Sequence, residues 1–68
     1  MEKDVISKNI LFYREQNHYT QLALAKKLGG SASLVSNYEN GYSTPDIFTL
    51  WKMADIFDIT IDELVGRK

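Results

Sequence analysis

The sequence predicts an all-α fold, a bundle of five short helices. Apolar residues recur at intervals of three and four along most of the 68-residue chain, which is the spacing of one face of an α-helix. No stretch alternates apolar and polar residues for long enough to indicate a strand. The chain is divided into five segments by residues that interrupt helices. These residues are Asn17-His18, Gly29-Gly30, Asn40-Gly41, Pro45 and Asp58.

The first segment runs from about Asp4 to Asn17, with Asp4 as a candidate N-cap. Its apolar stripe consists of Ile6, Ile10 and Tyr13. The second segment begins at Thr20, a residue type that caps helices, and ends at Gly29, which suits a left-handed helix end. Its inward face consists of Leu24, Ala25 and Leu28.

The third segment begins at Ser31, another N-cap candidate, and is stopped by Asn40-Gly41. Its inward side chains are Val35 and Tyr38. The fourth segment follows Pro45, which suits the first position of a helix. Its apolar stripe consists of Ile47, Leu50, Met53, Ala54 and Phe57.

The fifth segment has the clearest start signal of all. Thr60 and Glu63 have the spacing of a capping box, in which each side chain binds the backbone N–H of the other residue. Ile59 and Leu64 have the spacing of the hydrophobic staple that packs across such a box. Both signals predict a helix that starts directly after Thr60.

Length and composition favour one domain over residues 1–68, because a chain this short encloses a single small core. The hydrophobic fraction of 44% and the charged fraction of 25% are those of an ordinary globular protein. No apolar run approaches the roughly 18 residues of a membrane span, and the N-terminus lacks the apolar part of a signal peptide. We therefore expect a cytoplasmic protein without a membrane partner. It is either complete or an N-terminal domain that continues beyond Val65-Gly66-Arg67 into a linker.

The distribution of charge matters more than the total. A net charge of −1 and a pI near 5.7 argue mildly against nucleic-acid binding. Residues 1–45, however, carry five basic and four acidic side chains, whereas residues 46–68 carry three basic and five acidic ones. The acidic excess lies at the C-terminal end, which leaves the first three helices able to approach phosphate groups.

The sequence contains no constellation of catalytic or metal-binding residues. His18 is the single histidine and cysteine is absent, so His18 is expected to be a turn residue and not a metal ligand. The carboxylates of the C-terminal half fit helix surfaces and caps: Asp55, Asp58, Asp62 and Glu63. We expect neither an enzyme nor a cofactor nor a bound metal.

Residues 20–41 carry the functional signal. Two helices of about eight residues, joined by the short turn Gly29-Gly30-Ser31, cannot lie antiparallel and must cross steeply. The second of these helices then projects from the body, as a helix that enters the major groove of DNA does. Its outward residues are short and uncharged, which allows close approach to base edges: Ala32, Ser33, Ser36 and Asn37.

A longer pattern runs through the same stretch: Thr20-Gln21-x-x-Leu24-Ala25-x-x-Leu28-Gly29-x-Ser31-x-Ser33-x-Val35-Ser36-x-Tyr38-Glu39-Asn40-Gly41. It extends back to Ile6, Ile10 and Arg14 and forward through Pro45 and Leu50 to Ile61-Asp62-Glu63-Leu64. This pattern resembles the Xre/Cro-type helix-turn-helix family of phage repressors and bacterial regulators. The resemblance implies a phage-repressor-like five-helix bundle.

The resemblance also implies roles for individual residues. Base-reading positions match Ala32, Ser33, Ser36 and Asn37. Phosphate-contacting positions match Gln21, Asn40, Tyr42, Ser43 and Thr44. Arg14 and Glu39 match a structural ion pair, and the helix dipole supports this assignment, because an anion at a helix C-terminus such as Glu39 requires a cationic neighbour.

The implied function is that of a sequence-specific repressor that binds double-stranded operator DNA as a homodimer. Three departures from the family pattern qualify it. Gly30 replaces a β-branched residue, which predicts a looser turn, and His18 replaces the common glycine after the first helix. Asn9 stands where the family often has a basic side chain, so electrostatic affinity for DNA is expected to be low.

Surplus apolar residues leave an alternative open. Positions that are usually polar in the family hold Leu11, Phe12, Leu22, Phe48 and Ile56. Together with the acidic pI, they fit a protein-interaction module on the same fold, either antitoxin-like or regulator-binding. They also fit a surface for self-association, with Phe48 and Trp51 one helical turn apart on the fourth helix.

Overall fold

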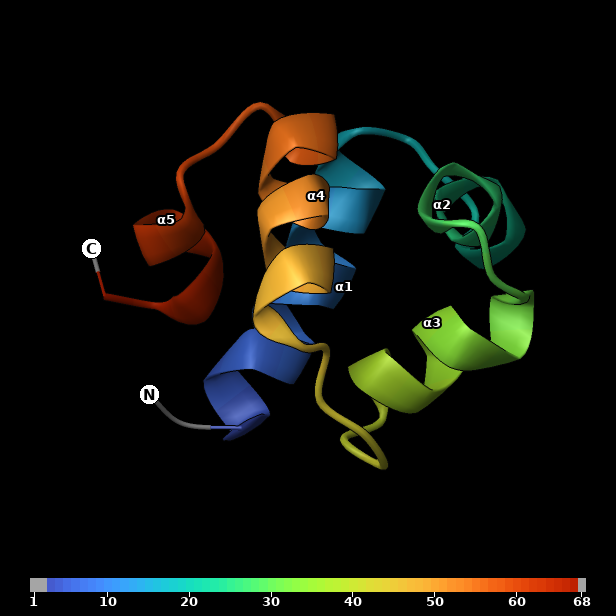
Figure 1. The fold of residues 1–68 in the computed structure, drawn as a ribbon, viewed down its shortest axis with the longest axis horizontal. Coiled ribbons are helices and arrows are strands. Elements are labelled where there is room, and N and C mark those ends of the chain that lie inside the picture. The colour runs from blue at the N-terminus through green and yellow to red at the C-terminus, as the bar shows by residue number, and fades with distance from the viewer. Residues whose placement is uncertain (1–2, 68) are drawn as a thin grey trace.

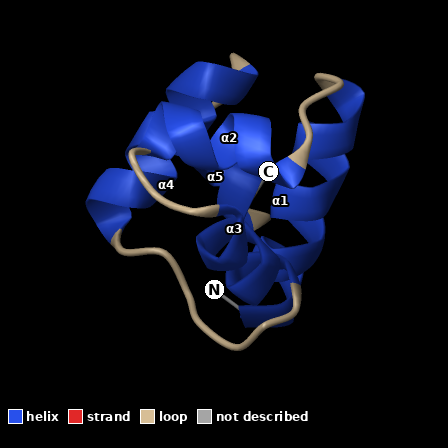
Figure 2. Cartoon of the chain, turned by 90° about the vertical axis from the view of Figure 1, so that its right-hand side faces the viewer, coloured by secondary structure: helices blue, strands red, loops and turns tan. Residues whose placement is uncertain are grey.

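The structure, a computed structural model, describes residues 3–67. In this part of the chain it contains five helices and no strand, and Figure 2 shows them joined by loops. The helices are α1 (Lys3–Gln16), α2 (Gln21–Leu28), α3 (Ala32–Glu39), α4 (Ile47–Phe57) and α5 (Ile61–Val65). The prediction of an all-α, five-helix fold is therefore confirmed.

The helices are arranged around α1 and α4, which occupy the middle of the molecule (Figure 1). α2 and α3 lie on one side of this pair and α5 lies on the other. α2 packs on α3 and α4, α1 packs on α3 and α5, and α4 also packs on α5. In Figure 1 α2 is seen end-on whereas α3 runs across the view, so the two helices cross steeply, as the short turn between them predicts.

The core receives side chains from all five helices. Nearly every residue of the predicted apolar stripes is buried or packs against it. Ile47 is the exception, with 54% of its surface exposed, because it occupies the first position of α4 at the edge of the buried stripe. The buried apolar residues are Ile6, Ile10, Leu24, Ala25, Val35, Tyr38, Leu50, Met53, Ala54, Phe57, Leu64 and Val65.

Two of the predicted helix starts have the expected caps. The hydroxyl of Thr20 accepts a hydrogen bond from the backbone N–H of Ala23 at 3.0 Å. Thr60 and Glu63 form both halves of the capping box, with distances of 3.0 and 3.1 Å. These starts could be predicted because each bond joins residues only three apart, so the local sequence determines it.

Two other cap assignments need correction. Asp4 lies inside the first turn of α1 and does not precede the helix. Its negative charge there still interacts favourably with the helix dipole. Pro45 is not the first helical residue, because Asp46 caps α4 by accepting the N–H of Thr49 at 2.8 Å. This hydrogen bond also lowers the pKa of the Asp46 carboxyl below its usual value. Ser31 precedes α3 as expected, but its side chain makes no capping hydrogen bond.

The backbone is strained just after the end of α1. His18 has a φ of 59°, in the left-handed region where a side chain crowds the following carbonyl group. His18→Gly should raise the free energy of unfolding by about 0.5–1 kcal/mol, since relief of the crowding outweighs the extra entropy of glycine in the unfolded chain. Thermal and urea denaturation measure this change.

Lys8→Gly is the matched control, because Lys8 is exposed in the middle of α1. There glycine should lower the free energy of unfolding by about 1 kcal/mol. If His18→Gly were destabilising to the same extent, the left-handed conformation would not be strained in this protein.

Candidate nucleic-acid interface

The turn that precedes α3 sets the direction in which this helix continues from α2. Gly29 ends α2 with a φ of 81°, a conformation that glycine adopts without steric cost. Its N–H donates to the carbonyl of Lys26 at 3.2 Å, and the N–H of Gly30 donates to the carbonyl of Ala25 at 2.9 Å. These bonds close the end of α2 and direct the chain into α3 at a steep angle.

Gly30 does not leave an empty space in this turn. A Cβ atom at residue 30 would lie 2.6 Å from Cδ2 of Leu34, so the Leu34 side chain occupies the place that a side chain at residue 30 would take. Leu34 is partly buried and packs against the core. The sequence predicts a looser turn here, but Leu34 fills it, and the Leu34 side chain therefore belongs to the body of the protein.

The outer face of α3 is formed by small polar side chains. Val35 and Tyr38 are buried in the core, so the opposite side of the helix faces away from the body. Ser33 and Asn37 are exposed on this face, whereas Ala32 and Ser36 are partly buried at its margins. Burial raises the pKa of the Tyr38 hydroxyl, and the Asp46 carboxylate adds to this shift. Of the four candidate base-reading residues, Ser33 and Asn37 are thus the most accessible.

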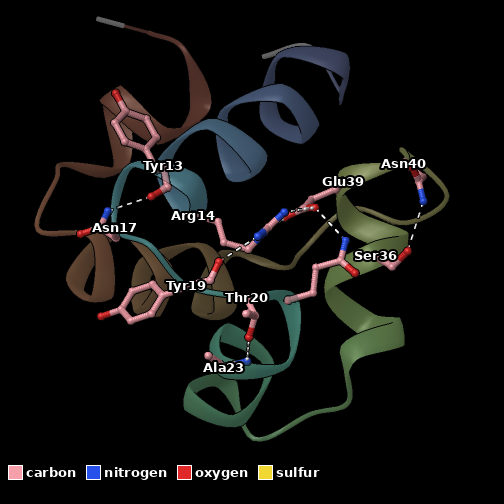
Figure 3. Close-up of polar contacts among 10 residues, drawn as sticks. Tyr13, Arg14, Asn17, Tyr19, Thr20, Ala23, Ser36, Glu39 and Asn40 are labelled. Carbon is pink, nitrogen blue, oxygen red and sulfur yellow. Dashed lines mark hydrogen bonds and ion pairs between the residues drawn. The ribbon is translucent and has the colours of Figure 1, made fainter.

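The C-terminal end of α3 is fixed by an ion pair with α1 (Figure 3). Arg14 donates from Nε to Glu39 Oε2 at 2.6 Å and from Nη2 to Glu39 Oε1 at 3.2 Å. The two side chains retain only 13% and 5% of their exposure. The hydrogen bond to Glu39 raises the pKa of the Arg14 guanidinium, which stays charged at every physiological pH.

Arg14 and Glu39 each make a further hydrogen bond outside the ion pair. Arg14 Nη1 donates to the carbonyl of Tyr19 at 2.8 Å, and Gln21 Nε2 donates to Glu39 Oε1 at 2.9 Å. Among the described residues no buried side-chain nitrogen or oxygen lacks a hydrogen-bond partner. The Arg14–Glu39 pair with Gln21 and Tyr19, here called the Arg14 network, therefore connects α1, the start of α2 and the end of α3.

The candidate phosphate-contacting residues lie at the start of α2 and in the loop that follows α3. Gln21 is the first residue of α2, where backbone N–H groups have no partner within the helix. Its side chain is partly buried, because one amide hydrogen is donated to Glu39. After α3, Asn40 and Thr44 are exposed, Ser43 is partly buried and Tyr42 has 80% of its surface exposed.

The loop after α3 is attached to this helix through backbone hydrogen bonds. The N–H groups of Tyr42 and Ser43 donate to the carbonyl oxygen of Asn37 at 2.9 and 3.3 Å. Asn40 Nδ2 donates to Ser36 Oγ at 3.2 Å, which joins the loop to the side chains of α3 (Figure 3). The outer face of α3 and the 40–44 loop therefore form one continuous surface.

Two structural roles were not found from the sequence. Asn9 Nδ2 donates to the carbonyls of Leu64 at 2.9 Å and Glu63 at 3.4 Å, so it satisfies the end of α5 from the side of α1. Lys27 lies over the ring of Tyr19, 5.4 Å from its centre, and is thus held at the surface by a cation–π contact. The Asn9 contact has no local signal, because Asn9 and Leu64 are far apart in the chain. The Lys27 contact joins α2 to the loop before it.

Other kinds of site find little support in residues 3–67. This part of the chain holds no group of three or more His, Cys, Asp or Glu side chains that could bind a metal ion. None of its helices is both long and apolar enough to cross a membrane. A hollow of about 340 Å³ lies between α4 and α5, away from the outer face of α3, and its lining is Trp51, Ala54, Asp55, Ile59, Thr60, Ile61 and Asp62.

The chain belongs to the Xre/Cro-type helix-turn-helix family, a family of DNA-binding transcriptional regulators and not of enzymes, since residues 10–64 match that family. It is 34% identical over 62 residues to the HTH-type transcriptional regulator ImmR of Bacillus subtilis, covering 91% of this chain and 49% of ImmR. It is 36% identical over 62 residues to the phage CTXphi transcriptional repressor RstR of Vibrio cholerae, covering 91% of this chain and 55% of RstR. The chain thus spans about half the length of these relatives.

A solved structure has the same fold. The SOS-response transcriptional repressor LexA from Eubacterium rectale superposes with a TM-score of 0.85, covering 93% of this chain and 67% of that chain. The sequence identity between the two is 28%. The prediction of a repressor-type helix-turn-helix fold is thereby confirmed.

The Arg14 network generates a prediction about stability. Glu39→Ala should lower the free energy of unfolding by about 3–5 kcal/mol, because it leaves the Arg14 guanidinium buried without its counter-ion. A thermal melt followed by circular dichroism measures the loss.

Glu15→Ala, in the exposed residue that follows Arg14, is the control and should change the free energy of unfolding by no more than about 0.5 kcal/mol. Equal melting temperatures for Glu39→Ala and the parent protein would show that the ion pair contributes nothing.

Proposed function

We propose that this chain is a sequence-specific DNA-binding domain that inserts α3 into the major groove of operator DNA. The observation that carries the proposal is the outer face of α3, where Ser33 and Asn37 are exposed. The C-terminal end of this helix is fixed by the Arg14 network. A major groove about 12 Å wide admits such a helix, and short side chains let its backbone come close to the bases.

Asn37 is the principal base-reading residue in this proposal. Its amide offers a donor and an acceptor together, which matches the N6 and N7 groups of adenine. Ser33, about one helical turn earlier, can donate to or accept from any base edge and therefore discriminates less. Ala32 and Ser36, at the margins of the face, contribute close packing against the neighbouring bases and backbone.

The phosphate contacts come from both sides of α3. The N-terminus of α2 is a suitable site for an anion, because its backbone N–H groups and its dipole both favour negative charge. Gln21 at this end has a second amide hydrogen for a phosphate oxygen, since only one is donated to Glu39. Asn40, Tyr42, Ser43 and Thr44 would hold the backbone on the other side.

The regulator is proposed to act as a homodimer and a repressor. One module of this size buries only about 600–1,000 Å² on DNA, and α3 carries no lysine or arginine. Neutralisation of phosphate supplies most of non-specific affinity, so a single copy would bind weakly. Two linked copies would gain avidity, and the names of RstR and LexA, both called repressors, support the direction of regulation.

Asn37→Ala should weaken binding to the best duplex site by about 1–3 kcal/mol and leave binding to random duplex nearly unchanged. The best site is first selected from a pool of random duplexes, and both affinities are then measured by fluorescence anisotropy. Asn17→Ala, in an exposed asparagine at the end of α1, is the matched control and should have no effect on either affinity. Equal losses on both duplexes would remove the base-reading role of Asn37.

Gln21→Ala should weaken binding to all sequences alike, because phosphate contacts position a protein without reading bases. The slope of affinity against salt concentration should stay nearly unchanged, since glutamine carries no charge. The measurement is repeated at two salt concentrations, with a melt to verify that the variant is folded. If the parent protein selects no duplex even at low salt, the protein-interaction module becomes the better assignment.

A further inference from the structure

The hydroxyl group of Ser36 has a hydrogen-bond partner for its oxygen but none for its hydrogen. Ser36 lies three residues after Ser33 on α3 and is partly buried at the margin of the outer face. Its Oγ accepts a hydrogen bond from Nδ2 of Asn40 at 3.2 Å (Figure 3). Within the described chain the hydroxyl hydrogen of Ser36 has no acceptor. This hydrogen is therefore available to a group outside the protein.

Asn40 is held in place for this contact by its own backbone. It is the C-cap of α3, and its N–H donates to the carbonyl of Ser36 at 2.9 Å. The backbone and the side chain of Asn40 thus both bind the residue one helical turn earlier. The chain beyond it is also fixed, because the N–H of Tyr42 donates to the carbonyl of Asn37 at 2.9 Å.

The position of Asn40 at a helix end favours one orientation of its amide group. The carbonyl oxygens of the last turn give the C-terminus of a helix a partial negative charge. Amide hydrogens are stabilised next to this charge, and the amide oxygen is repelled by it. Nδ2 of Asn40 therefore faces Ser36, and Oδ1 does not. Since an amide nitrogen can only donate, the Ser36 hydroxyl has to accept.

Acceptance of this bond makes the Ser36 hydroxyl a donor towards other groups. A hydroxyl group has one hydrogen and two lone pairs, and Asn40 occupies one of the lone pairs. A hydroxyl that accepts a hydrogen bond also becomes a stronger donor. If a donor on a base faced Ser36, the hydroxyl hydrogen would remain unpaired where DNA displaces the water, which is costly. An acceptor on the base satisfies this hydrogen.

We propose that Asn40 is a positioning residue that fixes the Ser36 hydroxyl as a hydrogen-bond donor, so that Ser36 distinguishes the two orientations of a G·C pair. In the major groove guanine presents the acceptors N7 and O6, whereas cytosine presents only the N4 donor. A serine without such a partner serves either edge. The inference rests on the proposed function and adds a hydrogen bond to the close packing of Ser36 in it.

Ser36→Ala identifies the base pair that Ser36 reads. The parent protein and this variant each select sites from one pool of random duplexes near neutral pH, and the position whose base preference differs is the one read by Ser36. Two duplexes are then made with a G·C pair in either orientation at this position. By fluorescence anisotropy the parent should bind one of them at least about fivefold more tightly. Ser36→Ala should bind both alike.

Asn40→Asp should reverse this preference. The ionised carboxylate introduced at residue 40 can only accept, so Ser36 donates its hydrogen to it and offers its lone pairs to the base. The orientation that the parent disfavours should then be bound more tightly. The added negative charge weakens binding to both duplexes and cancels in their ratio. Thr44→Asp, in an exposed residue of the same loop, is the charge-matched control and should keep the preference of the parent.

Asn40→Ala removes the hydrogen bond without adding a charge. The Ser36 hydroxyl can then rotate to donate or to accept, and the preference between the two duplexes should fall below about twofold. Thermal melts verify that each variant is folded at the temperature of the binding measurement. A purely structural role of Asn40 would lower both affinities in equal proportion and leave their ratio as in the parent.

The outcomes separate this inference from the proposed function. A preference that stays as in the parent in both Asn40 variants would overturn the role of Asn40. A Ser36→Ala variant that selects the same sites as the parent would overturn base reading by Ser36. Neither result changes the comparison of Asn37→Ala on specific and random duplexes, which tests the function itself. A parent protein that selects no duplex would overturn the proposed function and this inference with it.

Discussion

The bond between Arg14 and Glu39 is the interaction on which the rest of the structure depends. α3 is only eight residues long, too short to be stable by itself, so its position must be fixed by contacts with other helices. Val35 and Tyr38 anchor one side of it in the core, and the ion pair anchors its C-terminal end to α1. Burial of two charges is costly, but the pair is bidentate, and further hydrogen bonds join Arg14 to the carbonyl of Tyr19 and Glu39 to Gln21.

Helix starts and the inward faces of the helices could be predicted from the sequence because their causes are local. Thr20 and the Thr60–Glu63 box bond to groups three residues away, and the apolar periodicity alone identified most of the core. At Pro45 two local signals competed. Proline can open a helix, but the Asp46 carboxylate accepts the Thr49 N–H, and this hydrogen bond decides where α4 begins.

The rest depends on contacts between segments far apart in the chain. From the sequence, Asn9 could be described only as a neutral residue at a position that is often basic in the family. Its hydrogen bond to the end of α5 depends on the folded chain, in which α1 and α5 pack on each other. Gly30 suggested a loose turn, because the sequence does not show that Leu34 folds back over it. For the candidate site, the pattern correctly separated the inward from the outward side of α3, but not the graded exposure of Ser36 and Asn37.

The double hydrogen bond to the carbonyl of Asn37 has a consequence for the thermodynamics of DNA binding. Because the N–H groups of Tyr42 and Ser43 are already engaged there, the loop is ordered before any nucleic acid arrives. Loops that become ordered only on binding lose conformational entropy at that moment, and this loss reduces affinity. A domain with so little positive charge cannot compensate for such a loss through counterion release. An ordered loop in the free protein would therefore avoid a loss of affinity that this domain could not recover through electrostatic attraction.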